Sequence, residues 1–206
     1  TVDFATCTGT VNALEAVRLP AALQRFDCRN NRLAALGLQA DGFADAVRSA
    51  VARYGANRVA VILGTSTAGI YSTELAYRGR DTASGALPAS FLYAETHNAF
   101  SVADFVRHAL DLHGPAWAIS TACSSSAKVF ASAARLLQTR LADAVLVGGV
   151  DSLCLTTLYG FKSLGLTSAN PCRPYDAGRD GLSIGEAAAF ALLERLPASP
   201  AAVPPE

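Results

Sequence analysis

The sequence predicts an α/β fold in which a mostly parallel, mixed sheet is covered by helices. Short apolar runs alternate with segments of helical periodicity, and several of these runs end in glycine-containing turns. The chain has 206 residues, of which 51% are hydrophobic and 17% are charged, so it can bury a sizeable core. This composition excludes a predominantly disordered protein.

Two helices are expected ahead of the first strand. The first 40 residues show no sustained period, but a helix is predicted over 30–38 with Asn30 as its cap. Apolar residues then recur at helical spacing from Phe43 to Tyr54. Gly55 is expected to end this second helix in a left-handed conformation.

The first strand is predicted over 58–63, a segment that is apolar after its first residue and rich in β-branched side chains. It leads into a glycine-containing loop, 64–69, and such strand ends face ligand crevices in α/β sheets. The loop lacks the lysine of a P-loop and the G-x-G-x-x-G pattern of a dinucleotide fold. An ordinary turn is therefore favoured over a phosphate site.

The following segment, 71–100, carries scattered Gly, Pro, Ser and aromatic residues. This pattern predicts a long, partly irregular excursion of the kind that borders a site or covers a partner subunit. Ser101 and Asp104 are spaced as a capping box, and the helix that they open is expected to run through Leu112. Apolar and helical patterns then predict a strand at 116–119, a helix after Cys123, a strand at 144–147, a helix at 153–161 and a strand at 187–193.

Cys123 stands at the joint between the strand 116–119 and the long helix that follows. A cysteine in this position has the properties of a nucleophile, because first-turn N–H groups point at it and the helix dipole favours negative charge there. The dipole contributes only about 0.3–1 kcal/mol, so a complete catalyst also needs a base or another cation. The alternative is a small apolar side chain packed under a turn, and physical reasoning alone leaves the two interpretations nearly even.

The other cysteines and the histidines do not combine with Cys123 into a recognisable arrangement. No other cysteine joins the end of a buried strand to the start of a helix, so all four are interpreted as packed thiols. His108 and His113 are favoured as surface or cap residues, and no metal site is predicted because the cysteines are widely spaced and lack C-x-x-C. The four other cysteines are Cys7, Cys28, Cys154 and Cys172, and the third histidine is His97.

Charge and hydropathy limit the classes of partner and the cellular location that the sequence predicts. Lys+Arg and Asp+Glu both number 17, so no global field favours nucleic acid or a membrane surface. No run approaches the roughly 18 apolar residues of a membrane-spanning helix. With an odd number of free cysteines, these features predict a soluble, cytoplasmic protein.

Four blocks of the sequence resemble the β-ketoacyl-acyl carrier protein synthases and polyketide ketosynthases of the thiolase-like superfamily. The first is Ser120-Thr-Ala-Cys-Ser-Ser-Ser126, which resembles the active-site motif of that family. The others follow in the family's order and spacing: 144–151, the segment from Gly160 to Ser168, and 173–181 with Gly185 and Glu186. The resemblance runs from about residue 30 to residue 195 and covers an amino-terminal half only.

The resemblance implies that Cys123 takes an acyl group from the phosphopantetheine thioester of an acyl carrier protein. Decarboxylation of malonyl-carrier protein would then give the carbanion that accepts this acyl group in a Claisen condensation. Phe161 would line the acyl pocket, and a plain core aromatic is the alternative. No bound cofactor is expected, and the strand 116–119 would pair across a homodimer interface.

Departures from the family pattern limit this expectation. The family's two catalytic histidines, its lysine and its second oxyanion donor lie in carboxyl-terminal motifs that the sequence does not contain. The common Gly-Glu-Gly-Ala is Gly-Glu-Ala-Ala here, which leaves the role of Glu186 open. We expect a thiolase-like half over 1–196 and a Pro/Ala linker over 197–206, and no condensation by this fragment alone.

Two other functions compete with this interpretation. One is a non-catalytic scaffold similar to a chain-length factor, which the presence of Cys123 disfavours because such proteins typically lack it. The other is a hydrolase or acyltransferase that uses Cys123 with a local base, which the sequence does not show.

Overall fold

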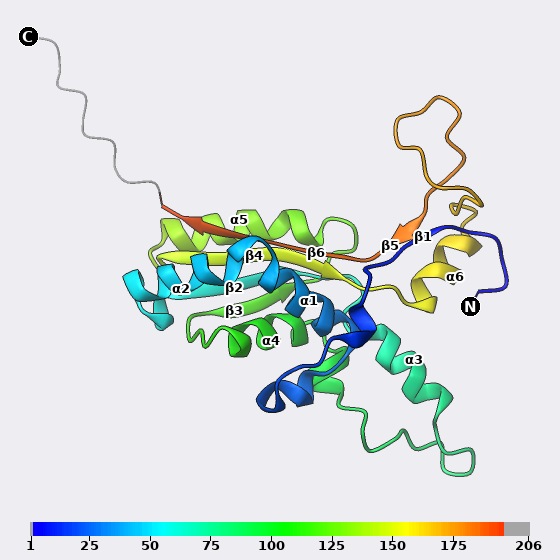
Figure 1. The fold of residues 1–206 in the computed structure, drawn as a ribbon, viewed down its shortest axis with the longest axis horizontal. Helices are drawn as coiled ribbons and strands as arrows, with labels where there is room; N and C mark the ends of the chain where they lie inside the picture. Colours follow the sequence, from blue (N-terminus) through cyan, green and yellow to red (C-terminus); the bar gives the residue numbers. More distant parts are fainter. Residues whose placement is uncertain (1, 196–206) are drawn as a thin grey trace, which may run out of the picture.

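The computed structural model describes residues 2–195, which form a central four-stranded sheet with helices on both faces (Figure 1). The strands lie in the order β3 (Ala116–Ile119), β2 (Val59–Gly64), β4 (Ala144–Asp151) and β6 (Ala187–Glu194). β2 is parallel to β3 and to β4, whereas β6 is antiparallel to β4. The predicted mostly parallel, mixed sheet is confirmed. A separate two-stranded ladder joins β1 (Thr8–Gly9) to β5 (Ile184–Gly185).

The two faces of the sheet have separate cores, which follow from the alternation of side chains along each strand. On β2, Val59, Val61 and Leu63 pack with α1 (Arg29–Gln39), α2 (Phe43–Tyr54) and α4 (Ser101–Ala109). Ala60 and Ile62 point to the opposite face and pack against α5 (Ser125–Gln138). Every residue of β2 is buried, as expected for a central strand in a helix-covered sheet.

Two further helices, α3 (Ile70–Arg78) and α6 (Leu155–Ser163), lie beyond the carboxyl ends of the parallel strands (Figure 1). Short helical segments complete the chain. They are η1 (Leu14–Ala16), η2 (Ala21–Phe26), η3 (Ala40–Gly42), η4 (Ala56–Arg58) and η5 (Tyr93–His97), of which the last is a π-helix.

All four main strands coincide with the apolar runs that predict them, and β4 extends further, to Asp151. The second helix ends as expected at Gly55, which has a positive φ of 87°. Its ψ of 149° is extended and not left-handed helical, and its N–H still donates to the carbonyl of Val51 at 2.8 Å.

The predicted cap at Asn30 is wrong, although the helix itself is confirmed as α1. Asn30 lies within the first turn, is buried, and neither polar atom of its side chain has a hydrogen-bond partner among the described residues. The adjacent Asn31 is also buried and donates its amide to the carbonyl of Phe26 at 2.9 Å. Both asparagines therefore lie on the packed side of α1, where a side chain cannot fold back over the helix start.

The predicted capping box at Ser101 is also wrong, and α4 ends before Leu112. The Ser101 hydroxyl donates to the carbonyl of Glu95 and accepts the amide of Asn31 at 2.9 Å. No side-chain cap is present at the start of α4. Partners from η5 and α1 have replaced the local cap that the spacing suggested.

The segment 71–100 is less irregular than predicted, because it begins with the helix α3 and ends with η5. Between these two elements, residues 79–92 contain no helix or strand. The scattered glycine and proline residues thus mark only this middle part.

Candidate active site

Cys123 lies in the tight turn between β3 and α5, and its side chain is exposed. The turn contains Ala122 at a positive φ of 54°, a conformation that costs a non-glycine residue about 1–3 kcal/mol. Ser124 is the N-cap residue of α5, so Cys123 immediately precedes the helix start. The predicted position of Cys123 at a strand-to-helix joint is confirmed.

Serine side chains hold this turn in place. The buried Ser125 hydroxyl accepts the N–H of Thr121 at 2.9 Å and donates to the carbonyl of Ala122 at 2.6 Å. Ser124 donates its hydroxyl to the carbonyl of Thr121 at 2.9 Å. From the loop after β2, Ser66 donates to the same Ala122 carbonyl at 2.8 Å. These bonds offset the strain at Ala122 and fix the direction in which Cys123 projects.

The loop after β2 is itself organised by Asp151 at the end of β4. Asp151 Oδ1 accepts the N–H groups of Ser66 at 2.6 Å and Thr67 at 2.9 Å. It also accepts the hydroxyls of Thr65 at 3.1 Å and Thr67 at 3.0 Å. Asp151 therefore closes the loop after β2 into a turn and occupies the N–H groups of Ser66 and Thr67.

Two glycines let the start of α5 approach the sheet. A Cβ on Gly64 would lie 2.5 Å from the backbone nitrogen of Ser126 and 2.6 Å from the carbonyl carbon of Ser125. A Cβ on Gly149 would lie 2.7 Å from the Cβ of Ser126. Gly64 at the end of β2 and Gly149 near the end of β4 therefore allow the start of α5 to pack directly on the sheet. We call this pair of residues the glycine seat.

A cavity of about 180 Å³ lies beside this turn. Its walls come from the loop after β2, from Ser120 in the turn itself, and from Tyr93, His97, Asn98 and Ala99. The last four belong to the segment 71–100, which was expected to border a site. The sequence offered no sign that His97 would line this cavity, because its position depends on how α3 and η5 pack.

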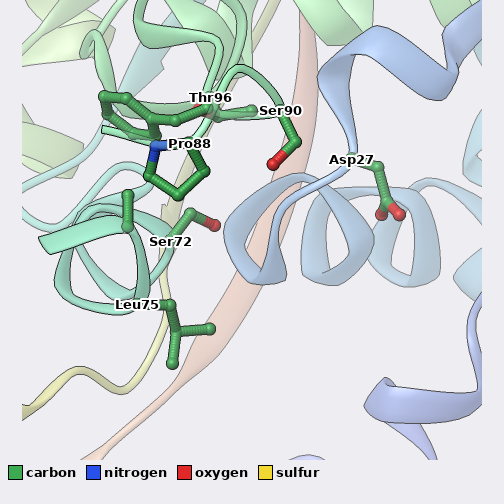
Figure 2. Close-up of a pocket in the computed structure, with 8 residues that line it drawn as sticks. Asp27, Ser72, Leu75, Pro88, Ser90 and Thr96 are labelled. Carbon is green, nitrogen blue, oxygen red and sulfur yellow. The ribbon is translucent and has the colours of Figure 1, made fainter. Parts of the chain in front are cut away.

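A second cavity, of about 290 Å³, lies between α3 and the segment that leads into η5 (Figure 2). Ser72 and Leu75 of α3 lie opposite Pro88, Ser90 and Thr96, and Asp27 closes another wall. The Asp27 carboxylate is held by Arg32 at 2.5 Å and 2.8 Å, which keeps the pKa of Asp27 below its usual value. None of the lining residues belongs to the turn that carries Cys123.

The other thiols differ in exposure. Cys28 is buried, and burial raises the pKa of its thiol to about 11. Burial also raises the pKa of Cys154, whose sulfur contacts the Thr157 hydroxyl at 3.1 Å. Cys7 is half-buried and Cys172 is exposed. The interpretation as a packed thiol is therefore confirmed for Cys28 and Cys154 and is wrong for Cys172, which lies in the loop before β5.

Phe161 lies on α6, half-buried, and is not among the residues that line the cavity beside Cys123. The start of α6 is held by Glu74 of α3, which accepts the N–H groups of Leu155 at 3.1 Å and Thr156 at 2.6 Å. The structure thus places Phe161 on α6, beyond the carboxyl ends of the parallel strands, and Cys123 follows the carboxyl end of β3. Its role in substrate binding stays a prediction.

His108 and His113 have the surface roles that were expected. His108 Nδ1 lies 2.8 Å from the carbonyl of Asp104, and its ring packs on Phe26 with centroids 5.4 Å apart. His113 is exposed and lies 3.0 Å from Asp111. Neither lines the cavity beside Cys123.

Glu186 lies between β5 and β6, and its side chain has no exposed surface. Arg29 of α1 donates to both of its oxygens, at 2.8 Å and 2.7 Å. The backbone N–H groups of Val11 and Leu153 complete its contacts, each at 3.1 Å. Glu186 is thus a structural link between the amino-terminal segment, α1 and the connection from β4 to α6.

No helix within residues 2–195 combines the length and the apolar character that crossing a membrane requires. The same part of the chain holds no group of three or more His, Cys, Asp or Glu side chains arranged to bind a metal ion.

Comparison with known proteins identifies the family. Residues 25–199 match the family described as "Beta-ketoacyl synthase, N-terminal domain". Nodulation protein E of Rhizobium meliloti is 31% identical over 138 residues, which are 66% of this chain and 34% of that protein. The 3-oxoacyl-[acyl-carrier-protein] synthase 2 of the same organism is 32% identical over 145 residues, again 66% of this chain and 34% of the relative.

Solved structures agree with this match. The ketosynthase ApeO in complex with its chain length factor ApeC, from Xenorhabdus doucetiae, gives a TM-score of 0.79 at 34% identity, over 93% of this chain and 47% of that chain. A β-ketoacyl synthase from Burkholderia phymatum gives 0.73 at 25% identity, over 86% and 44%. The chain thus spans about a third of the curated relatives and about half of the solved ones. It belongs to the β-ketoacyl synthase family, whose amino-terminal domain it contains.

Proposed function

We propose that this chain is the nucleophile-bearing half of a β-ketoacyl-acyl carrier protein synthase and that Cys123 carries the acyl group. The observation that supports this most strongly is the exposed cysteine immediately before α5, in a turn held by side-chain hydrogen bonds. The family of the chain supports the reaction class.

In the proposed step, the Cys123 sulfur attacks the thioester carbonyl of an acyl group carried on phosphopantetheine. A new bond forms from that carbon to Sγ, the old carbon–sulfur bond breaks, and the phosphopantetheine thiol leaves with the proton from Cys123. The backbone N–H of Cys123 would donate to the oxyanion, where the start of α5 contributes a favourable dipole. Phe161 would border the acyl chain in the complete enzyme.

Condensation requires groups beyond these residues. Decarboxylation of a malonyl thioester and stabilisation of the resulting carbanion would use the two histidines, the lysine and the second oxyanion donor expected in a carboxyl-terminal half. We therefore assign acyl transfer to Cys123 to this chain and condensation to the complete enzyme. In this proposal, residues 1–196 form one thiolase-like half and 197–206 form the linker, which lies outside the described residues.

The proposed partners are an acyl carrier protein and a second copy of the chain. β3 has β2 as its only sheet neighbour within residues 2–195, and all four of its residues are half-buried. This free edge supports a homodimer in which two β3 strands pair. We place the protein in the cytoplasm, in fatty acid or polyketide synthesis, because all five of its cysteines are free thiols.

The test is acyl transfer from an acylated carrier protein to the purified chain, followed by intact-mass analysis and peptide mapping. One acyl group is expected on Cys123, and Cys123→Ser should abolish it. Cys172→Ser is the matched control, because it removes the other exposed thiol and should leave the transfer unchanged. Absence of the Cys123 adduct would contradict the proposal, and rapid loss of the acyl group to water would favour a hydrolase.

A further inference from the structure

The cavity beside the turn of Cys123 is bordered by both polar and apolar side chains, the latter from Ala68, Ile70, Tyr93 and Ala99. Its walls include the hydroxyl-bearing residues Thr65, Ser66 and Ser120 together with His97. Ser66 also touches the turn directly, through its hydrogen bond of 2.8 Å to the Ala122 carbonyl. Through Ser66 and Ser120 the cavity therefore adjoins the turn that carries Cys123, and Cys123 itself is not among the lining residues.

His97 is the polar side chain of this wall whose orientation is fixed by contacts with neighbouring residues. Its Nδ1 is hydrogen-bonded to the Thr73 hydroxyl of α3, and its ring stacks on Tyr93 with centroids 5.1 Å apart and an interplanar angle of 28°. Within residues 2–195, Nε2 makes no hydrogen bond. The imidazole is thus fixed from one side and has one ring nitrogen available to a ligand.

The volume of the cavity and the polarity of its walls together determine which acyl chains it would bind. An apolar cavity of about 150 Å³ holds a benzene molecule, so about 180 Å³ corresponds to a chain of roughly six carbon atoms. A saturated chain that covered the free nitrogen of His97 would leave it without a partner, which is unfavourable for a polar group removed from water. A chain with a hydrogen-bonding oxygen avoids this loss.

We propose that His97 is a specificity-determining residue, which favours short acyl groups that carry a hydroxyl or carbonyl oxygen over saturated chains of the same length. Thr73 is its positioning residue, since it holds the other ring nitrogen. This inference rests on the proposed attachment of the acyl group to Cys123.

The test compares two alkylating agents of matched shape, N-butyl iodoacetamide and N-(3-hydroxypropyl) iodoacetamide. The hydroxyl can donate or accept, so it suits either tautomer of His97. Alkylation rates at each cysteine are followed by peptide mass spectrometry. Cys172, which is exposed and does not line this cavity, reports the intrinsic reactivity of the two reagents in the same sample.

At Cys123 the hydroxyl reagent should be favoured by about fivefold or more over its ratio at Cys172, within the range that single pocket contacts provide. His97→Leu should remove this preference, and Thr73→Val should reduce it while keeping the side-chain shape. His113→Leu, at an exposed histidine, is the matched control and should leave the ratio unchanged. Circular dichroism confirms that each variant is folded.

Equal ratios at Cys123 and Cys172, or a preference that survives His97→Leu, would overturn the assignment. Because alkylation needs no thioester donor, this result is independent of acyl transfer. Failure of the inference alone would appear as acyl transfer to Cys123 without any oxygen preference, whereas failure of the proposed function would appear as no acyl transfer to Cys123.

Discussion

At the scale of single residues, Glu186 illustrates how one buried carboxylate can hold distant segments together. It accepts two hydrogen bonds from Arg29 and one each from the N–H groups of Val11 and Leu153. Burial raises the pKa of Glu186, but these donors more than offset that effect and leave the pKa below its usual value. The folded state is therefore built around the ionised form.

We predict that Glu186→Gln lowers the free energy of unfolding by about 3 kcal/mol, because it removes the buried charge partner of the mostly buried Arg29 guanidinium and leaves only the exposed Glu15 to pair with it. Urea unfolding monitored by circular dichroism measures this change. Glu15→Gln is the control, since Glu15 also pairs with Arg29 but is 68% exposed, and its loss should cost at most about 1 kcal/mol. Similar losses for both variants would contradict the structural role of Glu186.

The contribution of Glu186 should also depend on pH. A carboxylate with a lowered folded-state pKa stabilises the fold fully above its unfolded value of about 4.3, and this stabilisation is lost as the pH falls toward the folded value. The difference in stability between the wild type and Glu186→Gln should therefore be largest near neutral pH and shrink below about pH 4. A difference that grew on acidification would be incompatible with this account.

At the scale of elements, the turn before α5 depends on close approach between the helix and the sheet. The glycine seat formed by Gly64 and Gly149 leaves no space for a Cβ, and Ala122 accepts a strained φ so that Cys123 can project outward. Hydrogen bonds from Ser125 and Ser66 hold that conformation.

We predict that Gly64→Ala destabilises the chain by about 1–3 kcal/mol and slows iodoacetamide labelling of Cys123, because the new Cβ collides with backbone atoms of Ser125 and Ser126. Thermal unfolding and peptide-resolved labelling measure the two effects. Gly160→Ala is the matched control, since a Cβ there meets nothing within 4 Å inside α6 and should stabilise that helix by about 0.5–1 kcal/mol. Unchanged labelling in Gly64→Ala would contradict the proposed seat.

The positions of the strands and helices could be predicted from the sequence more accurately than the residues at which the helices begin and end. Apolar runs identified every main strand. β2 and most of β4 are buried on both faces, which leaves a sequence signal that does not depend on neighbours, and the apolar runs also extend through the half-buried β3. The caps assigned to Asn30 and Ser101 failed, because both side chains lie in packed contacts between segments far apart in the sequence. Such tertiary contacts cannot be inferred from local spacing.

Some features of the candidate site could likewise be predicted from the sequence, and others could not. The position of Cys123 at a strand-to-helix joint could be predicted, because it depends only on the order of elements. The contact of His97 with the cavity and the control of the 65–67 loop by Asp151 could not, because each joins segments separated by 20 residues or more in the sequence.

At the scale of the whole molecule, ion pairs connect the strands at one end of the sheet, and the edge strand β3 has an unpaired side within the described residues. Asp143 accepts Arg58 at 2.7 Å and also pairs with Arg195, which joins the residues that flank β2, β4 and β6 and lowers the pKa of Asp143 to about 2. On the other side of β2, the edge of β3 has no neighbour within the described residues.

We predict that the chain forms a dimer through β3 and that Ala118→Pro prevents it. The carbonyls of Pro115 and Ile119 bond to β2, so the N–H of Ala118 points toward the free edge, and proline removes that donor without removing a bond to β2. Sedimentation velocity should show a dimer for the wild type and for Ala118→Gly, and a folded monomer for Ala118→Pro. A dimer that persists in Ala118→Pro would exclude pairing along this edge.

The most direct test of the account is the location of the acyl group after the chain meets an acylated carrier protein. Mass mapping is expected to find the acyl group on the peptide that contains Cys123 and to find Cys172 unmodified, although both thiols are exposed. Acylation divided between the two thiols, or found on Cys172 alone, would show that exposure and not the turn before α5 determines reactivity, and would contradict the account.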